Sequence, residues 1–411
     1  MMIRPIREDA RAIALAAIDA VRPNEAVRRT LEQLDTQRDY YLVAVGKAAW
    51  QMASAALKYL PRPVKDGVVV TKYGHVMGEL HNVRCFEAGH PVPDENSYIG
   101  TQAVLDMVGK LGKEDRVLFL LSGGGSALFE KPLIKPELLQ ELTQRLLRGG
   151  ADIVEINTVR KRLSAVKGGR FALACGGAEI EAIILSDVLG DPVDMIASGP
   201  AAPDSTSCAD ALKIAEKYSL LFDESIEKCL RVETPKELTN VNTRIIGSVK
   251  ALCLAAAAEA EKLGYEARIL SDRMDCEAKE AGRGLAALLR KHAQDGKKLA
   301  FIAGGETVVH VKGKGLGGRN QELALSAAEG IAGLHNAALI SVGSDGTDGP
   351  TDAAGGIVDG ETLRRLREKG IDYNAILEDY DAYHGLEAVD SLIRTGPTGT
   401  NVNDVTIALL A

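Results

Sequence analysis

Short apolar segments of strand length alternate with longer amphipathic segments along this chain of 411 residues. In the longer segments apolar residues recur with the period of a helix, whereas the short segments are apolar throughout. In the first half, this pattern predicts an opening helix that ends at Pro23, strands at 41–45, 68–71, 85–87, 117–121 and 181–185, and helices at 48–59, 98–109 and 136–147. Because strands that alternate with helices usually pair in parallel, the fold class is α/β with crossover helices.

A polar stretch at residues 232–243, VETPKELTNVNT, contains a proline and shows no periodicity, so it predicts a domain boundary. The alternation then resumes, with strands predicted at 266–270, 299–303, 307–311, 337–342 and 405–410 and helices at 248–263, 276–293 and 319–330. We therefore expect an N-terminal Rossmann-like α/β lobe at 1–235 and a C-terminal α/β lobe at 240–411. Each would hold a mostly parallel or mixed sheet flanked by helices.

Composition and charge exclude several classes of protein. The formal net charge of −8 argues against a nucleic-acid partner, because no basic face is evident. No apolar run approaches the length of a membrane span, and acidic residues interrupt the N-terminal segment where a signal peptide would be apolar. The six cysteines form no CxxC pair, which predicts neither a zinc site nor a disulfide framework and suits a reducing cytoplasm.

The segment at residues 117–132, VLFLLSGGGSALFEKP, is the first candidate for a binding site. A buried strand runs into Ser122, Gly123, Gly124, Gly125 and Ser126, and an apolar pattern that could open a helix follows. Glycines allow positive φ angles and a close approach by a ligand, and a helix start adds partial positive charge. The turn therefore predicts an anion site, most often for phosphate. The alternative is a tight βα turn without a ligand.

Other polar side chains of the first half also follow predicted strands. Lys47 follows the strand at 41–45, and Asp187 follows the strand at 181–185. In parallel sheets ligands bind beyond the carboxyl ends of the strands. Lys47 could therefore reach a phosphate, or it could be a surface helix lysine, and Asp187 could bind a metal or take a hydroxyl proton. Asn157 and Lys161 lie in a basic stretch, INTVRKRLSAVKGG, whose ordinary interpretation is a solvated helix face.

In the second half, Gly313, Gly315 and Gly318 match GxGxxG within GGETVVHVKGKGLGGRNQE. The match predicts dinucleotide binding only weakly, because the acidic residue Asp345 lies 27 residues past Gly318 rather than about 20. Lysines and Arg319 crowd the same turn, which suits a polyphosphate or a carboxylate better than a nicotinamide ribose. The alternative is a glycine-rich connection without a ligand.

The segment at residues 343–356, GSDGTDGPTDAAGG, places Asp345, Asp348 and Asp352 within eight residues. Oxygen ligands on a flexible loop suit Mg²⁺, which keeps several waters and bridges substrate phosphates. A solvated acidic turn is the alternative. Near the C-terminus, TGPTGTNVND places Asn401 on a polar loop before the last strand.

Several common catalytic motifs are absent. The sequence contains no GxxxxGK[ST], no GxSxG and no HExxH, which excludes a P-loop, a nucleophile elbow and a zincin site. His90, in the turn-rich segment GHPVPDENS, is expected to be structural rather than catalytic.

Taken in order, the motifs GKAA, GHPVPD, LSGGGSAL, INTVRKRLSAVKGG, SDVLGD, GGETVVHVKGKGLGGRNQE, GSDGTDGPTDAAGG and TGTNVND resemble the MOFRL-type glycerate 2-kinases over nearly the whole chain. The resemblance implies two α/β lobes, the second MOFRL-like, with the active site in the cleft between them. It implies ATP- and Mg²⁺-dependent phosphorylation of D-glycerate to 2-phosphoglycerate. One departure is Ala201, where the family usually has Thr. By their positions in these motifs, the family residues that are important for activity correspond to Lys47, Glu306, Arg319, Asp345 and Asn401.

On this hypothesis Lys47 and Arg319 supply fixed cations, and the turn at Ser122–Ser126 holds phosphate oxygens. Asp345 and Asp187 would hold Mg²⁺ or orient the hydroxyl, and which carboxylate acts as a base stays open. Asn157, Lys161, Glu306 and Asn401 complete the predicted binding residues.

Small molecules would be the only ligands, with a homodimer possible. One alternative is an NAD(P)-dependent hydroxypyruvate reductase or a related 2-hydroxy-acid oxidoreductase. Another is a non-catalytic sensor of phosphorylated metabolites.

Overall fold

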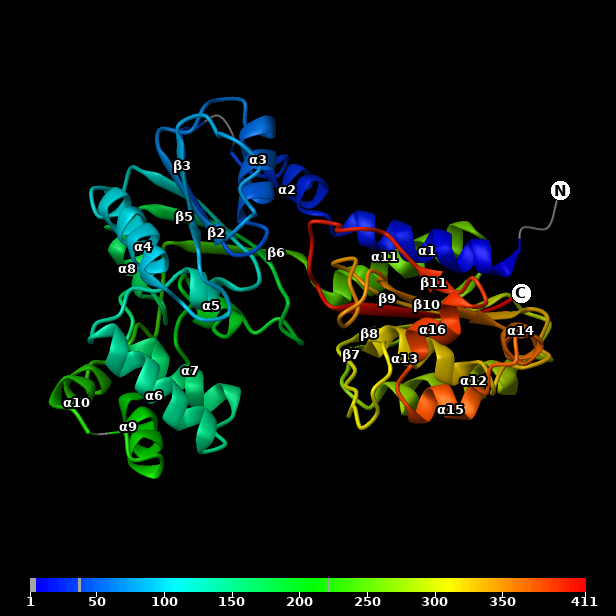
Figure 1. Cartoon of the computed structure of the whole chain (residues 1–411). Coiled ribbons are helices and arrows are strands. Elements are labelled where there is room, and N and C mark those ends of the chain that lie inside the picture. The colour runs from blue at the N-terminus through cyan, green and yellow to red at the C-terminus, as the bar shows by residue number, and fades with distance from the viewer. Residues whose placement is uncertain (1–4, 36–37, 221) are drawn as a thin grey trace. The chain divides into compact units, whose positions relative to one another are not determined.

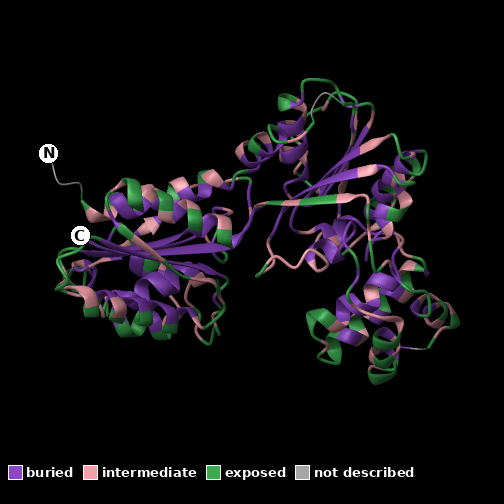
Figure 2. Cartoon of the chain, turned by 180° about the vertical axis from the view of Figure 1, so that it is seen from behind, coloured by how far each residue is buried: buried purple, intermediate pink, exposed green. Residues whose placement is uncertain are grey.

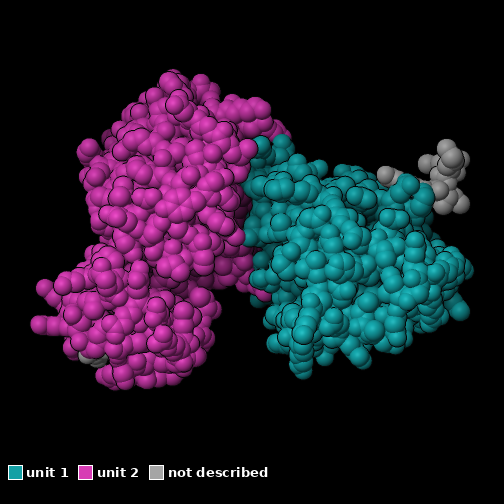
Figure 3. All heavy atoms as spheres, viewed as in Figure 1, with its two compact units in different colours: residues 1–25, 247–411 teal, residues 26–246 magenta. Residues whose placement is uncertain are grey.

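The computed structural model describes residues 5–35, 38–220 and 222–411. These residues form two compact units, each built on its own six-stranded sheet (Figures 1 and 3). Unit 2 is Ala26–Ile246, and unit 1 combines the described residues up to Glu25 with Gly247–Ala411. The α/β fold class, with two sheets flanked by helices, is confirmed.

The sheet of unit 2 has the strand order β3-β2-β1-β4-β5-β6. Its first five strands in this order pair in parallel, as predicted from the alternation of strands and helices. The strands are β1 (Tyr41–Val45), β2 (Gly67–Lys72), β3 (Val83–Ala88), β4 (Arg116–Leu121), β5 (Glu179–Leu185) and β6 (Val241–Gly247).

Helices complete unit 2 in two groups (Figure 1). Those near the sheet are α2 (Pro23–Leu31), which begins in unit 1 and continues into unit 2, α3 (Ala49–Tyr59), α4 (Glu95–Val108), the single turns α5 (Gly125–Leu128) and α8 (Arg170–Ala174), and the 3₁₀ turn η1 (Ile196–Ser198). The others pack around a small core of their own, in which Leu142, Leu146 and Leu163 are fully buried. They are α6 (Pro136–Arg148), α7 (Ile153–Arg162), α9 (Cys208–Lys217) and α10 (Glu224–Leu230).

The central strands of unit 2 are apolar on both faces because helices cover both faces of a parallel sheet. From Val117 to Leu121, strand β4 is buried at every position. Phe119 packs against Phe171 with ring centroids 4.5 Å apart, and Phe129 meets Phe171 at 5.5 Å. This rigid core supports the glycine turn that follows β4.

The sheet of unit 1 has the order β11-β10-β9-β12-β8-β7 and is mixed. Only β7 and β8 pair in parallel, and the other neighbours pair antiparallel. The strands are β7 (Glu266–Met274), β8 (Leu299–Gly305), β9 (Ala337–Gly343), β10 (Gly355–Asp359), β11 (Leu392–Ile393) and β12 (Asp404–Leu410).

Helices cover both faces of this sheet, which Figure 2 shows buried between them. On one face lie α1 (Ile6–Ala20) and α11 (Val249–Lys262), and on the other lie α12 (Ala278–His292) and α13 (Arg319–Ala327) (Figure 1). The remaining helices of unit 1 are α14 (Thr362–Glu368), α15 (Tyr373–Glu378) and α16 (Ala382–Glu387). None of the described helices is long and apolar enough for a membrane span.

The structure differs from the predicted elements at residues 307–311 and at the polar stretch of residues 232–243. Residues 307–311 form a loop rather than a strand, with only an isolated bridge from Val308 to Glu277. Strand β6 begins inside the polar stretch that was predicted as a domain boundary, and its largely exposed side chains hid the strand pattern. The sheet of unit 1 is mixed, within the expected range of mostly parallel or mixed sheets, because β12 inserts antiparallel between β8 and β9.

The opening helix, α1, is part of unit 1, although it precedes unit 2 in the sequence. The predicted division put residues 1–25 in the first lobe, whereas α1 is part of unit 1. Its buried face, with Ile13 and Ala17, packs against α11, and Asp9 accepts a 2.9 Å hydrogen bond from the Tyr265 hydroxyl. A contact that spans 256 residues of sequence leaves no local signal.

Candidate active site

In unit 2, two neighbouring strands bring Lys47 to the glycine turn. Strands β1 and β4 pair in parallel with Val45 opposite Leu121, so the residues that follow each strand lie side by side. The Lys47 N–H donates to the Gly123 carbonyl at 2.9 Å, and the Ala48 N–H donates to Ser122 Oγ at 3.0 Å. Two segments that are 76 residues apart in sequence therefore form one tied pair of turns.

The glycine turn needs the conformations that glycine allows. Gly124 has φ +86°, in the left-handed region, and precedes the single turn of α5. A helix of four residues sums few peptide dipoles, so the expected contribution from a helix dipole is not supported. The positive character of this turn comes instead from Lys47.

Three ionisable side chains surround the two central glycines. A Cβ at Gly123 would lie 2.0 Å from Asp187 Oδ2, and a Cβ at Gly124 would lie 3.1 Å from both His90 Nε2 and Lys47 Cγ. The absence of side chains at these glycines thus lets Asp187, His90 and Lys47 approach the turn closely. Sequence analysis predicted that Lys47 and Asp187 would meet here, but it did not include His90.

The Lys47 side chain is half-buried, and its ammonium has no hydrogen bond or ion pair with any residue in the described ranges. A partly desolvated cation attracts an anion more strongly than an exposed one because its field is less screened. Burial, followed by the charge of Lys47 and of other basic neighbours, lowers the pKa of His90. The imidazole is therefore neutral at neutral pH.

Ser126 and Asn157 are linked through a serine that sequence analysis did not single out. Ser126 Oγ lies 3.1 Å from Ser198 Oγ, and the Ser198 hydroxyl donates to Asn157 Oδ1 at 2.9 Å. Ser198 is buried and has φ +62°, an uncommon angle for serine. These hydrogen bonds thus connect α5, α7 and η1 in one hydroxyl network.

Lys161 does not face this network. Its Nζ is fully buried and donates to Asp204 at 3.0 Å and to Asp194 at 3.2 Å. Arg162 and Lys167 are also buried and bind Asp204 and Glu130 respectively, so the basic stretch is not the solvated helix face that composition suggested. Lys161 has the contacts of a structural ion pair, and no contact supports the ligand-binding role predicted for it.

In unit 1, Arg319 holds two carboxylates at the end of the sheet (Figure 1, where α13 is labelled and β12 is the red strand at the end of the chain). Its Nε and Nη2 donate to Asp404 at 2.6 and 3.1 Å, and Nη1 donates to Glu306 at 2.8 Å. Asp404 opens β12 opposite Gly305 of β8, so strand pairing places it beside Glu306. Sequence analysis predicted Glu306 and Arg319 but missed Asp404, although the motif TGTNVND contains it.

The Asp404 carboxyl is only 5% exposed. Burial raises the pKa of Asp404 to about 6, and the charge and hydrogen bonds of Arg319 offset this rise only in part. Burial alone would lower the pKa of Arg319, but Asp404 and Glu306 more than compensate and raise it. The guanidinium is therefore always charged, whereas its partner titrates.

Asp345 lies next to this cluster. A Cβ at Gly343, the last residue of β9, would lie 3.3 Å from Asp345 Oδ1 and 3.5 Å from Asp404 Oδ1. Asp345 Oδ1 accepts the N–H and the hydroxyl of Thr347 at 2.9 and 3.1 Å. The loop that carries Asn401 is tied to the same place, because the Thr398 N–H donates to the Asp345 carbonyl at 3.2 Å.

The other two aspartates of the acidic loop point elsewhere. Asp348 accepts the N–H groups of Asn320 and Gln321 at 3.1 and 2.9 Å and so closes the first turn of α13. Asp352 binds Arg394 at 2.9 Å. The expected magnesium site of three aspartates is therefore not formed, and among the described residues no group of three or more His, Cys, Asp and Glu could hold a metal.

The GxGxxG match does not form a dinucleotide-binding turn. Strand β8 ends at Gly305 and α13 begins at Arg319, so the glycines lie in a loop of 13 residues. The amides of Lys314 and Leu316 donate to the carboxylates of Asp379 and Asp381. Because Asp348 occupies the N-terminus of α13, the position for a pyrophosphate in such a fold is filled by the protein's own carboxylate.

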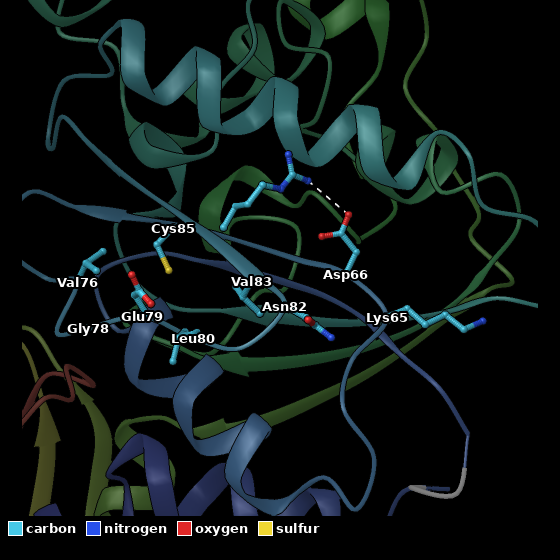
Figure 4. Close-up of a pocket in the computed structure, with 10 residues that line it drawn as sticks. Lys65, Asp66, Val76, Gly78, Glu79, Leu80, Asn82, Val83 and Cys85 are labelled. Carbon is cyan, nitrogen blue, oxygen red and sulfur yellow. Dashed lines mark ion pairs between the residues drawn. The ribbon is translucent and has the colours of Figure 1, made fainter.

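A surface pocket of about 720 Å³ lies along the residues before β2, the loop from β2 to β3 and the start of β3 (Figure 4). Residues that precede β2, such as Asp66, and residues that open β3, such as Arg84, line it and form an ion pair of 3.6 Å. None of the predicted site residues lines this pocket. The candidate functional residues therefore lie in the polar cluster of each unit and not in this cavity.

Comparison with known proteins identifies the relatives of this chain. A model of the MOFRL family matches residues 299–404, and a model described as a domain of unknown function (DUF4147) matches residues 9–231. The chain is 52% identical to a D-glycerate 2-kinase of Thermotoga maritima over 404 residues, which are 97% of each protein. It belongs to the MOFRL-type glycerate kinase family.

A solved member of this glycerate kinase family has the same architecture. The crystal structure of glycerate kinase from Thermotoga maritima matches 99% of both chains with a TM-score of 0.95 and 51% identity. A protein named putative hydroxypyruvate reductase, from Agrobacterium vitis, is 38% identical over 416 residues and covers 98% of this chain and 94% of its own. The relatives of this glycerate kinase family member are thus named either as kinases or as a putative reductase. The chemistry of the site must decide between these two activities.

Proposed function

We propose that this protein is an ATP- and Mg²⁺-dependent kinase that phosphorylates D-glycerate at the 2-hydroxyl. The observation that carries the proposal is Lys47, a half-buried cation whose ammonium has no partner among the described residues, held beside a glycine turn in a glycerate kinase family member. Phosphoryl transfer needs positioned positive charge more than covalent catalysis, and this arrangement supplies it.

Unit 2 would bind anionic oxygens. Lys47 gives a point charge, and the glycines at 123–125 let oxygens approach the backbone without meeting a side chain. Asp187 lies against Gly123 and is suited to accept the hydroxyl proton.

Unit 1 would position carboxylates for the same reaction. Arg319 fixes Glu306 and Asp404, and Asp345 lies beside them. Asp345 Oδ1 is used by Thr347, whereas Oδ2 makes no hydrogen bond within the described residues. One such oxygen fits Mg²⁺, which takes one or two carboxylates and keeps waters and phosphates as its other ligands. When bound, Mg²⁺ supplies charge neutralisation for the phosphates. Asn401 would contribute from the adjoining loop.

The chemical step balances without a further reactant. The 2-hydroxyl oxygen of glycerate forms a bond to the γ-phosphorus of ATP, and the bond from that phosphorus to the ADP oxygen breaks. The hydroxyl proton passes to a carboxylate, for which Asp187 and Asp345 are the candidates.

The name of the Agrobacterium relative keeps a reductase as the second candidate. The geometry disfavours it, because the amides of the GxGxxG loop and of the α13 N-terminus already bind Asp379, Asp381 and Asp348. A nicotinamide dinucleotide would have to displace these internal carboxylates.

The test is product identification. The protein is incubated with ATP, Mg²⁺ and D-glycerate, and ³¹P NMR distinguishes 2-phosphoglycerate from 3-phosphoglycerate. A parallel reaction with hydroxypyruvate and reduced nicotinamide cofactor is followed by nicotinamide absorbance. We expect 2-phosphoglycerate and ADP in the first reaction and no absorbance change in the second. Oxidation of the cofactor without phosphoglycerate would overturn the proposal in favour of the reductase.

A further inference from the structure

His90 has no role in the proposed reaction so far. Its ring is half-buried, and it makes no hydrogen bond with any residue that the structure describes. Its ring nitrogens are not among the buried polar atoms that lack a partner, so they remain accessible from solvent. A half-buried imidazole whose nitrogens are accessible and bind no described residue is available for a hydrogen bond to a ligand.

The segment around His90 keeps its shape without the imidazole. Asp94 caps α4 by accepting the Ser97 N–H at 3.0 Å, and it accepts a 2.6 Å hydrogen bond from the Tyr73 hydroxyl. Gly89 is packed so closely that a Cβ there would lie 2.7 Å from the Val92 carbonyl and 3.0 Å from Asp94 Oδ2. These contacts account for the structural part of the motif GHPVPD, and they leave the ring of His90 unexplained.

The ring lies at the glycine turn. Both its Nε2 and Cδ2 atoms would be 3.1 Å from a Cβ at Gly124, and Lys47 Cγ would be equally close. His90 and Lys47 therefore flank the same residue, one with a neutral donor and the other with a charge. Lys47, Lys72 and His75 around the ring favour its neutral form, which carries one N–H donor.

We propose that His90 is a substrate-binding residue of the proposed kinase, whose Nε2–H donates a hydrogen bond to an anionic oxygen bound beside Lys47 and Gly124. This inference rests on the proposed function. The oxygen belongs either to a phosphate of ATP or to the carboxylate of glycerate, and the two sources share this chemistry. The charge of Lys47 attracts the anionic oxygen, and the hydrogen bond from His90 fixes its orientation.

The test compares His90→Ala, His90→Gln and His90→Asn with the wild-type enzyme in steady-state kinetics. His81→Ala is the matched control, because His81 is an exposed histidine of the same unit. A lost hydrogen bond to a charged group should lower kcat/KM of His90→Ala by roughly tenfold to a hundredfold. A higher KM for ATP identifies a phosphate oxygen, and a higher KM for D-glycerate identifies the carboxylate.

The two amide variants separate a binding role from a structural one. The Gln amide nitrogen reaches about as far as Nε2, whereas that of Asn reaches only as far as Nδ1, so we expect His90→Gln to recover activity and His90→Asn not to. Activity of His90→Ala within twofold of the wild type would overturn the proposal. Equal losses in all three variants, with lower melting temperatures, would also overturn it by showing a packing role.

Failure of the proposed function is recognised separately. If the wild-type protein forms no phosphoglycerate, inorganic phosphate is titrated into the wild type and His90→Ala by calorimetry. Weaker binding by the variant then supports an anion contact at His90, and equal binding or no binding overturns it.

Discussion

The polar cluster around Lys47 and the polar cluster around Arg319 differ in whether the cation is paired with a carboxylate of the protein. Lys47 in unit 2 stands beside a turn of glycines, and its ammonium has no partner among the described residues. Arg319 in unit 1 is held by two internal carboxylates, one of which is 5% exposed. A cation that is already paired has little charge left for a ligand, whereas an unpaired one gains a strong hydrogen bond when an anion binds.

This difference indicates that Lys47 is suited to bind an anionic ligand, whereas Arg319 is suited to position carboxylates of the protein. Lys47 can meet an incoming anion without breaking any protein contact. Arg319 can do so only by sharing its donors, and its main effect is to fix Glu306 and Asp404 beside Asp345. We therefore expect Lys47 to matter for turnover alone and Arg319 to matter for both folding and turnover.

The largest effect is expected from Arg319→Ala. It leaves the buried Asp404 carboxyl without its counter-charge, which should lower the free energy of unfolding by about 3 kcal/mol and also reduce turnover. Urea unfolding followed by circular dichroism measures the change. Trp50 is the only tryptophan and lies in unit 2, so its fluorescence reports on the other unit separately.

A matched control is Arg367→Ala, at an exposed position of unit 1, which should change stability by less than about 0.5 kcal/mol. If Arg319→Ala were as stable as this control, Arg319 would be less tightly coupled to folding than its contacts indicate.

Lys47→Met should lower turnover without lowering stability, in contrast to Arg319→Ala. Removing one cation that meets substrate charge should cost roughly 3 kcal/mol, on the order of a hundredfold in kcat/KM. The melting temperature should not change, because the ammonium binds none of the residues that the structure describes. Steady-state kinetics and thermal unfolding on the same preparation test both statements.

Lys161→Met provides the contrast within unit 2. It removes the buried ammonium from Asp194 and leaves Arg162 as the buried cation of Asp204, so it should lower the melting temperature while the folded fraction keeps its KM values. A raised KM in a stable Lys161→Met variant would restore the ligand-binding role that the sequence suggested.

The pH dependence of stability sharpens the comparison further. The pKa of Asp404 is raised to about 6 by burial, against about 3.9 in an unfolded chain. Between these values the folded state holds a proton that the unfolded state has released. Stabilisation from this group is therefore complete below about pH 4 and is lost as the pH rises through 6.

The measurement is the difference in unfolding free energy between the wild type and Asp404→Asn. It should fall by about 2–3 kcal/mol from pH 4 to pH 6, since each unit of pKa shift is worth about 1.4 kcal/mol. A constant difference over this range would show that Arg319 keeps the carboxylate charged throughout.

The smallest effect is expected from Gly124→Ala. At φ +86° a side chain costs about 1–2 kcal/mol, and the new methyl would press on His90 and Lys47. Gly74→Ala is the control, because Gly74 has φ +77° and no atom within 4 Å of a Cβ. Both variants should lose similar stability, but only Gly124→Ala should lose activity. Equal activity in the two would mean that the turn does not contact substrate.

Much of unit 2 could be predicted from the sequence because its signals are local. The apolar strands β1, β4 and β5 were recognisable, and parallel pairing then required Lys47, Ser122 and Asp187 to meet at one edge. His90 was taken as structural because its loop is rich in turn residues. Only the structure shows that its ring lies on Gly124, with no hydrogen bond to any described residue.

Unit 1 was harder to predict because its order comes from distant segments. The last strand, β12, inserts between β8 and β9 and carries Asp404 to Arg319, 85 residues earlier in the chain. Similarly, the acidic loop looked like one metal site, but Asp348 closes α13 and Asp352 binds Arg394. Partners at such separations leave no periodic trace in the sequence.

The sequence by itself determined the alternation of strands and helices, the parallel sheet of unit 2 and the flexible turn after its central strand, because hydrophobic period and glycine content act within a few residues. Only the tertiary structure decided which charges are paired. Lys47 and Lys161 are alike in sequence terms, but a carboxylate 43 residues away lies against one of them, and no described carboxylate binds the other. Burial makes that difference large, because charges removed from water must find a partner in the protein or in a ligand.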